Sequence, residues 1–379
     1  MMDCEINEKR LLDDFCALVA VRCSTHDERE IADILTSRLQ ALGAQVHEDG
    51  AGAELGGNAG NLVADFPGTV TGAPTIMLTA HMDCVEPCAG IRPIIENGLI
   101  HTDGTTILGG DDKAGVAAIL EALRQIKERQ LPHGPLQVVF TISEEGGVHG
   151  SQHLDQSLLH ADYGYTFDTH GHPGLMSYAA PGKNQIVIHI HGKAAHAGQC
   201  PEKGCNAIIA AGKLLADAPQ GRIDAETTCN AGLITGGSAT NVVADSCTLR
   251  YEARSRDAAK LKKLTQSIVD HFEQGAAATG CTVTTEVAPD YEPYRIAQDS
   301  PAIKLATRAC QEVGLTARLE ESGGGSDASH FNEYGVPTVV MGVGMTNAHT
   351  TEEQLLEQDL YDAGRLALGL ILTAGRTKD

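Results

Sequence analysis

Apolar segments with strand character alternate with amphipathic helical segments along much of the chain, and this alternation restricts the fold more than any other feature. Alternating strands and helices favour a mostly parallel, twisted sheet with helices on both faces. We therefore predict an α/β fold. Thr25 and Glu28 have the spacing of a capping box for the second helix. The expected strands are 61–66, 75–80, 136–142, 162–167 and 337–343, and the expected helices are 5–21, 27–42, 113–129 and 301–313.

The pattern changes near Pro181. Strands are expected at 185–192, 228–235, 245–253 and 281–287, with helices at 205–216 and 256–275. This β-α-β-β-α-β order is typical of a ferredoxin-like α+β sandwich, and a chain of 379 residues is long enough for two domains. We predict a catalytic, metal-binding domain at 1–181 and 294–379, interrupted by an inserted domain at 182–293.

Composition argues against several classes of partner. A formal net charge of −22 repels phosphate backbones and anionic lipid, so we expect no nucleic-acid or membrane partner. The eleven cysteines are scattered without a disulfide framework, which favours reduced thiols. The N-terminus lacks a basic region followed by an apolar stretch, and no window approaches the roughly 18 apolar residues of a membrane span. We expect a cytoplasmic protein.

Histidines and carboxylates gather where the strands of the catalytic domain end. Ligand sites of open α/β sheets lie at the carboxyl ends of strands. Each group alone has an ordinary explanation as a helix cap, an exposed turn or a core histidine. Together, so many carboxylates without basic partners are unfavourable unless they are protonated or bridged by metal. The groups are His81 with Asp83, Asp111 with Asp112, Glu144 with Glu145, Asp168, and His349.

This set of side chains also indicates the metal and the chemistry. Two imidazoles and three carboxylates, without an obligatory thiolate, suit Zn²⁺, and Co²⁺ or Mn²⁺ could substitute. Two ions about 3.5–4 Å apart that share a carboxylate lower the pKa of water and polarise a carbonyl. One further carboxylate must then stay unligated as a general base. We predict two Zn²⁺ per subunit and a hydrolytic reaction.

Seven motifs, in order from about residue 60 to 355, are similar to peptidase T and its shorter relatives. This family belongs to the aminoacylase and glutamate carboxypeptidase group of co-catalytic zinc exopeptidases. The resemblance implies a zinc-exopeptidase-like catalytic domain and an inserted domain that serves as lid and forms a homodimer. The motifs are HMDCVEP at 81–87, DGTTILGGDDKAG at 103–115, SEEGG at 143–147, FDTHG at 167–171, GKAAHAG at 192–198, GGGSDASHF at 323–331 and GVGMTNAHTTEE at 342–353.

The resemblance implies a ligand set for two zinc ions. His81 and Asp168 would bind one ion, and Glu145 and His349 would bind the other. Asp111 would bridge both ions.

It also implies roles for residues that bind no metal. Asp83 would orient His81. Glu144 would take a proton from a water held between the metals and deliver it to the leaving amine. His196 would reach the active site of the other subunit and stabilise the oxyanion. Residues expected to bind the substrate are Asn241, Arg254, Gly324, Gly325, Ser326 and Asp327.

The function expected from this resemblance is release of the N-terminal residue of tripeptides or similar short peptides. The same metal site would also suit an N-acyl amino acid amidohydrolase or a dipeptide carboxypeptidase. A third hypothesis is a catalytically silent metal- or peptide-binding protein, against which the presence of Glu144 and all five ligands argues. Turnover of a free-amine tripeptide against its N-acetylated form distinguishes the first two.

Overall fold

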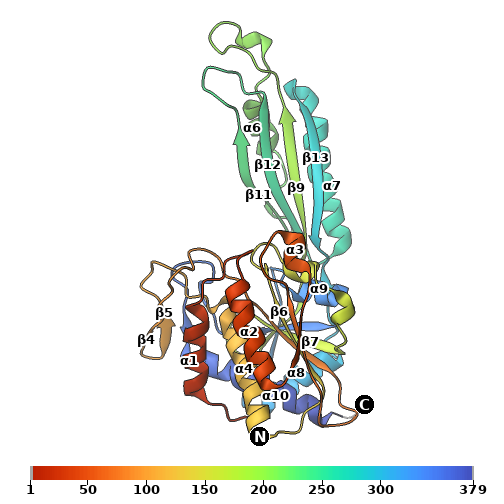
Figure 1. Cartoon of the computed structure of the whole chain (residues 1–379). Helices are drawn as coiled ribbons and strands as arrows, with labels where there is room; N and C mark the ends of the chain where they lie inside the picture. Colours follow the sequence, from red (N-terminus) through yellow and green to blue (C-terminus); the bar gives the residue numbers. More distant parts are fainter. Residues whose placement is uncertain (1–2, 378–379) are drawn as a thin grey trace. The chain divides into compact units, whose positions relative to one another are not determined.

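A computed structural model describes residues 3–377. The chain divides into two compact units, which are described separately here, and Figure 1 labels their elements. The first unit contains the described residues up to Ala179, then Ile296–Ser322 and the described residues from Ser326 onward. The second contains Ala180–Arg295 and Gly323–Gly325. Within residues 3–377, no helix has the length and apolarity needed to cross a bilayer.

The first unit contains helices and strands in alternation. Its helices are α1 (Glu8–Val19), α2 (Arg29–Leu42), α3 (Ala51–Leu55), α4 (Gly110–Arg129), α5 (His149–Gln152), α8 (Pro301–Glu312), α9 (Ala328–Glu333) and α10 (Glu357–Arg376), with a 3-10 turn at Gln156–Leu158. Its strands are β1 (Gln45–Glu48), β2 (Leu62–Phe66), β3 (Ile76–His81), β4 (Ile94–Glu96), β5 (Leu99–His101), β6 (Leu136–Thr141), β7 (Tyr163–Thr169), β8 (Leu175–Ala180), β15 (Arg318–Glu321), β16 (Thr338–Gly342) and β17 (Leu355–Leu356).

The main sheet of this unit runs in the order β1-β2-β6-β3-β7-β16-β8, and β15 also pairs with β8. Its centre is parallel, because β3 pairs in parallel with both β6 and β7, and β16 pairs in parallel with β7. The flanking pairs β1–β2, β2–β6 and β16–β8 are antiparallel. All six residues of β3 are buried, as expected for a central strand covered on both faces. The predicted α/β fold with a mostly parallel sheet is confirmed.

Helices cover both faces of this sheet. On one face, Met77, Val139 and Phe331 belong to one buried apolar cluster, and α9 contacts β16 and β7. On the other face, α4 contacts β3 and β7. Gly115 permits that contact, because a Cβ at this position would lie 2.5 Å from the carbonyl oxygen of Phe167. The start of α4, which carries Asp111, is thereby held close to the end of β7.

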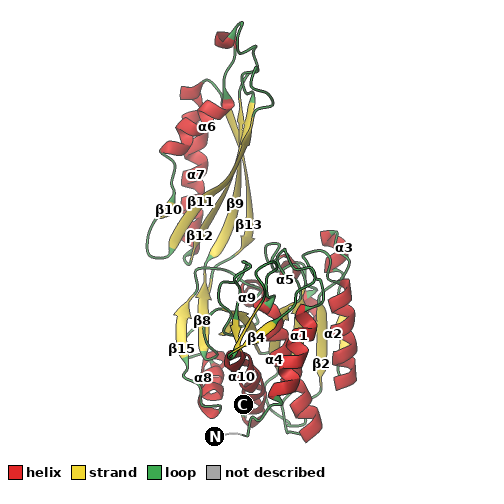
Figure 2. Ribbon diagram, turned by 90° about the vertical axis from the view of Figure 1, so that its left-hand side faces the viewer, coloured by secondary structure: helices red, strands yellow, loops and turns green. Residues whose placement is uncertain are grey.

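The second unit is an antiparallel sheet with two long helices, as Figure 2 shows in yellow and red. The sheet order is β10-β11-β12-β9-β13, and Ile188 of β9 and Phe272 of α7 share one apolar cluster. The predicted ferredoxin-like order is confirmed. The elements are β9 (Gly182–His191), a 3-10 turn (Pro201–Lys203), α6 (Ala207–Ala216), β10 (Gly221–Arg222), β11 (Thr227–Gly236), β12 (Ser246–Ser255), α7 (Ala258–Thr279), β13 (Thr282–Tyr291) and β14 (Tyr294–Arg295).

The predicted capping box at the start of α2 is wrong. The N-cap of α2 is Glu28, and in the described chain its side chain makes no capping hydrogen bond. Thr25 Oγ1 instead donates to Asp83 Oδ2 at 2.6 Å. Glu28 Oε1 accepts hydrogen bonds from the backbone N–H groups of His26 and Ser143. Both side chains thus support the loops of the predicted metal site rather than the helix end.

Candidate metal centre and active site

The carboxyl ends of the parallel strands bring the predicted ligands together. His81 is the last residue of β3 and is paired in register with Thr141, the last residue of β6, three residues before Glu144. Asp168 lies at the end of β7. β16 ends beside β7, where Gly342 is opposite Thr169, and the loop that follows β16 carries His349.

Asp111 lies at the centre of this cluster and has 8% of its surface exposed. Its Oδ1 is 2.9 Å from His81 Nε2, and its Oδ2 is 3.2 Å from His349 Nε2. The two oxygens of one carboxylate therefore face two different imidazoles.

Glu145 and Asp168 complete the predicted set. Glu145 Oε2 is 3.0 Å from His349 Nε2, and Asp168 Oδ1 is 4.0 Å from His81 Nε2. Glu145 Oε1 is buried and has no hydrogen-bond partner among residues 3–377, although a buried carboxylate oxygen normally has one. One donor atom each from His81, Asp111 and Glu145 lie within 4.8 Å of one another. This donor set, with its orphaned oxygen, fits a divalent cation.

Asp112 belongs to this neighbourhood, and the sequence did not single it out as a ligand. One carboxylate oxygen of Asp112, one of Asp168 and a ring nitrogen of His81 lie within 4.8 Å of one another. However, Asp112 Oδ2 accepts the N–H of His81 and Oδ1 accepts the N–H of Gly115. Asp112 therefore braces the backbone on both sides of the cluster.

The electrostatics of the cluster favour added positive charge. Burial raises the pKa of Glu144 and of Asp168 well above the usual values, and the charge of Asp168 raises the pKa of Glu144 further. Hydrogen bonds to Asp111 and Glu145 raise the pKa of His349 to about 11. A cation bound among these groups would compensate the charge of the carboxylates.

Asp83 connects two of the ligand loops. It is fully buried, and its Oδ1 is 3.4 Å from His81 Nδ1. The backbone N–H groups of Glu144 and Glu145 donate to its carboxylate at 3.0 and 3.2 Å. Asp83 therefore holds the imidazole of His81, through its backbone oxygen at 3.1 Å from Nδ1 as well as its carboxylate, and fixes the turn that presents Glu144.

His196, Asn241 and Arg254 lie in the second unit. His196 Nδ1 accepts the backbone N–H groups of Gly198 and Gln199, both at 3.2 Å. A neutral imidazole with an accepting Nδ1 carries its proton on Nε2. Asn241 lies next to this loop, because its carbonyl oxygen accepts the N–H of Ala197 at 3.0 Å.

The guanidinium of Arg254 is occupied by a neighbour on the same strand. Its Nε and Nη2 donate to the two oxygens of the Glu252 carboxylate at 3.0 and 3.1 Å. An Arg–carboxylate pair of this fork geometry is among the stronger side-chain interactions. A substrate carboxylate would have to compete with Glu252 for this site.

The glycine-rich segment is divided between the units. Gly324 and Gly325 belong to the second unit, where a Cβ on Gly325 would lie 2.3 Å from the Tyr291 ring. Ser326 and Asp327 belong to the first unit and are buried. Asp327 Oδ2 accepts a hydrogen bond from Thr141 Oγ1 at the end of β6. Asp327 therefore supports the edge of the sheet beside Glu144.

Glu353 is a buried residue of the site whose role the sequence analysis missed. Its Oε2 accepts the N–H groups of Leu108 and Gly109 at 2.9 and 2.8 Å, and its Oε1 accepts the N–H of Asp111 at 3.0 Å. Glu353 stands four positions after His349 inside one of the recognised motifs. Its place in this motif could have indicated a role in the site. The backbone groups that its carboxylate binds are visible only in the folded structure.

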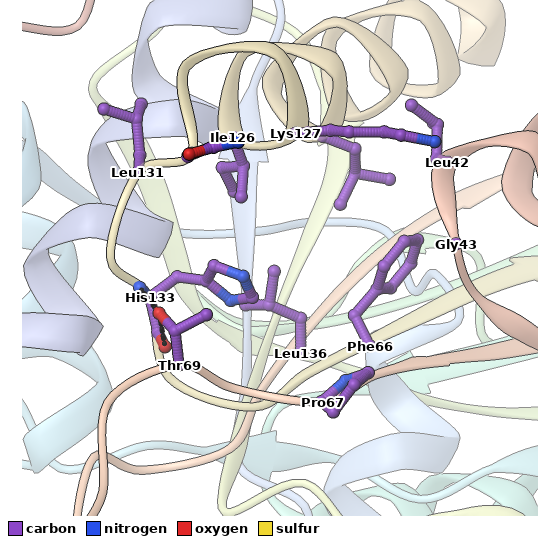
Figure 3. A pocket seen from close by; sticks show the side chains of 12 residues that line it. Leu42, Gly43, Phe66, Pro67, Thr69, Ile126, Lys127, Leu131, His133 and Leu136 are labelled. Atoms are coloured by element: carbon purple, nitrogen blue, oxygen red, sulfur yellow. Dashed lines mark hydrogen bonds between the residues drawn. The ribbon is translucent and has the colours of Figure 1, made fainter.

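The pocket in Figure 3 is a different place. It is lined mainly by apolar side chains, among them Phe66, Ile126 and Leu131, and includes Leu136, the first residue of β6. The candidate ligands lie at the opposite, carboxyl end of the same strand. This pocket is therefore not part of the metal site.

Comparison with known proteins decides the family. Residues 77–373 match Peptidase family M20/M25/M40. The chain belongs to this family. The resemblance to peptidase T is also confirmed. The chain is 28% identical over 396 residues to Peptidase T of Alkaliphilus oremlandii, and the match covers 92% of each sequence.

Two solved structures are similar over nearly the whole chain. A tripeptidase from Staphylococcus aureus is 40% identical, with a TM-score of 0.94, over 98% of this chain and all of that one. Aminopeptidase PepT from Bacillus cereus is 41% identical, with a TM-score of 0.90, over the same shares. These relatives and the family match confirm the sequence-based prediction that the M20 chain is a metallo-exopeptidase.

Proposed function

We propose that this M20 enzyme is a two-zinc aminopeptidase that releases the N-terminal residue of tripeptides. The observation that supports it most directly is Asp111, whose two oxygens face His81 and His349 separately. A carboxylate in that position is suited to bridge two ions. The names of the similar Staphylococcus aureus and Bacillus cereus structures, a tripeptidase and an aminopeptidase, support the choice of substrate.

In this proposal His81 and Asp168 hold one zinc ion, Glu145 and His349 hold the other, and Asp111 bridges them. Asp112 stays outside the set because its oxygens already accept two backbone N–H groups. Bound zinc would polarise the scissile carbonyl and lower the pKa of a nearby water. A bound cation would give Glu145 Oε1 a partner, since this buried oxygen has no hydrogen-bond partner among residues 3–377.

Glu144 is the proposed general base and acid. Its backbone is fixed by Asp83, and no hydrogen bond of its side chain to a proposed ligand is present among residues 3–377. A carboxylate that binds no metal can act as the general base. It would accept the proton of the attacking water and pass it to the departing amine.

His196 is proposed to stabilise the oxyanion. Because its Nδ1 accepts two backbone N–H groups, Nε2 carries the donor hydrogen that such a role requires. This role places His196 in the active site of the other subunit of a homodimer. Asn241 and Arg254, with backbone of Gly324, Gly325 and Ser326, are proposed to hold the substrate carboxylate, and Asp327 to support that loop.

The first unit is proposed to be the catalytic domain, and the second to be the lid and the dimer interface. β10 covers only the start of β11, because it pairs with Thr228 and Cys229. Within the described chain, the rest of β11 is an open strand edge that exposes Leu233 and Ile234 by 63% and 53%. Ile208 lies beside it, near Gly237. We propose that this edge pairs with the same edge of a second copy of the chain in the homodimer.

The substrate proposal is tested with zinc-loaded enzyme on a small panel of peptides. We expect release of the first residue from a free-amine tripeptide and little turnover of its N-acetylated form. Cleavage of the blocked form alone would instead assign an N-acyl amino acid amidohydrolase. Release of the C-terminal residue from the tripeptide, or turnover of dipeptides alone, would assign a carboxypeptidase. The free thiols of the chain favour the cytoplasm as its compartment.

The role of Glu144 is tested by Glu144→Gln. The amide keeps the shape of the side chain but cannot take a proton, so kcat should fall by at least about 10²-fold. Zinc content, measured by elemental analysis, should stay at the wild-type value. Wild-type turnover in the zinc-loaded variant would refute the assignment of the base.

A further inference from the structure

Two cysteines of the second unit, 76 positions apart in sequence, lie side by side in space. Cys205 precedes α6, Cys281 precedes β13, and their Sγ atoms are 2.8 Å apart. At this distance the two thiols are in direct contact. The buried pair Cys23 and Cys84, at 3.9 Å, does not share this closeness. We propose that Cys205 and Cys281 are a modification site at which a low-molecular-weight disulfide forms a reversible intramolecular cross-link.

The two thiols differ in their access to an oxidant. Cys205 is half-buried, whereas Cys281 has 5% of its surface exposed. Burial and the neighbouring Cys205 raise the pKa of Cys281 to about 11. Cys205 is therefore the thiol that meets the oxidant first, and Cys281 is the thiol that resolves the intermediate.

The exchange proceeds in two steps that balance. The thiolate of Cys205 attacks one sulfur of oxidised glutathione, which forms a mixed disulfide and releases one molecule of glutathione. Cys281 then loses its proton and attacks Cys205 Sγ, displacing the second glutathione. In total, two thiols are oxidised by two electrons, and one disulfide of the small molecule is reduced to two thiols.

The location gives this cross-link a consequence for the loop of His196. Cys205 and Lys193 exchange two backbone hydrogen bonds of 2.9 Å, so they form the base of the loop that carries His196. Cys281 directly precedes Thr282, which pairs with His191 at the end of β9. A bond between the sulfurs would tie the base of this loop to the first residues of β13. Any effect on catalysis rests on the proposed role of His196, whereas the cross-link itself does not.

The test uses the full chain, purified in reductant, desalted and incubated with oxidised glutathione. We expect the count of reactive thiols under denaturing conditions to fall from eleven to nine. Mass spectrometry of a non-reducing digest should find the peptide of Cys205 joined to that of Cys281. Amide hydrogen exchange of residues 193–205 should slow at least about threefold in the oxidised protein, and added thiol should reverse all three changes.

Matched variants make the assignment specific. Cys205→Ser and Cys281→Ser should each prevent the loss of the thiol pair, whereas Cys23→Ser should leave the cross-link unchanged. A thiol count that stays at eleven, a linkage between other cysteines, or a mixed disulfide that persists at Cys205 would each overturn the proposal. The modification site stands whether or not the cross-link changes peptide turnover, because it does not rest on the proposed role of His196.

Discussion

Glu353 holds together two of the loops that carry proposed ligands. It follows His349 by four positions, and its carboxylate accepts backbone N–H groups from Leu108, Gly109 and Asp111. The side chain is 1% exposed, so these three hydrogen bonds are protected from water. The loop of His349 and the turn of Asp111 are therefore fixed relative to each other before any metal binds.

We predict that Glu353→Gln weakens zinc binding by about 10–100-fold, the usual effect of losing a group that orients metal ligands. The amide presents an N–H group where the backbone needs an acceptor, so at least one of the three hydrogen bonds is lost. Zinc affinity is measured by competition with a chromophoric chelator. The matched control is Glu352→Gln, one position away and exposed. Equal affinities of the two variants would contradict the role of Glu353.

The raised pKa of Glu28 predicts that the free energy of unfolding depends on pH. Burial raises its pKa from 4.5 to about 7, and the negative charge of Asp83 contributes. The folded state therefore binds this proton more tightly than the unfolded state does. The associated stability is present below pH 4.5 and is lost as the pH rises to 7, by about 3 kcal/mol.

Glu28→Gln should remove this loss. In metal-free protein, its free energy of unfolding relative to wild type should increase by up to about 3 kcal/mol between pH 4.5 and pH 8. Urea titrations at the two pH values measure the difference. Glu30→Gln, on the same helix but exposed, is the control and should show no such trend. A constant difference for Glu28→Gln would mean that its carboxyl group titrates normally.

Among the elements, α4 depends on one glycine for its position. A Cβ at Gly115 would lie 2.5 Å from the backbone oxygen of Phe167 and 2.6 Å from Asp112 Oδ1. Gly115→Ala must therefore push the start of the helix away from β7. We expect a loss of several kcal/mol in unfolding free energy, in the range of severe overpacking, together with weaker zinc binding.

Gly212 of α6 provides the opposite case. Among the described atoms, none lies within 4 Å of a Cβ built on Gly212, and the residue is exposed in the middle of a helix. Gly212→Ala should stabilise the protein by about 0.5–1 kcal/mol, because alanine loses less backbone entropy on folding. Thermal or urea unfolding of both variants tests the pair. Stabilisation by both would show that helix propensity, not local space, decides the sign.

The elements differ in how far the sequence could predict them. The buried strand β3 was predicted because its apolar residues form a continuous run. The helix α4 was predicted because its apolar residues recur with helical spacing. The helix α10 was missed, although its apolar and polar residues alternate with the same helical period as those of α2, which was predicted. The short strands β4 and β17 are two or three residues long, too short for a period to appear.

The same limit applies to the candidate site. His81, Glu145 and Asp168 could be predicted, because they follow strands whose ends must meet at one sheet edge. The roles of Asp112 and Glu353 could not, because these carboxylates act by accepting backbone N–H groups that the folded chain alone brings near. The sequence shows which residues follow a strand. It does not show which backbone groups a side chain will contact after folding.

For the whole molecule, the open edge of β11 predicts how two copies associate. Leu233→Glu places a charge at the most exposed apolar position of that edge, and the proposed dimer should dissociate at least about tenfold more easily. Val287→Glu is the matched control, since Val287 is 45% exposed on β13 at the opposite edge of the same sheet. Sedimentation velocity measures both. Dissociation by Val287→Glu alone would place the interface at the other edge.

The position of β16 has a consequence for biosynthesis. This strand is made after the entire second unit, yet it lies between β7 and β8, which are both made before that unit. A chain still being synthesised therefore keeps a gap in its main sheet until residue 342 has emerged, and His349 comes later still. A peptidase assembled in this order cannot hold its full set of proposed ligands, nor cut peptides, while it is attached to the ribosome with its C-terminal segment unfinished.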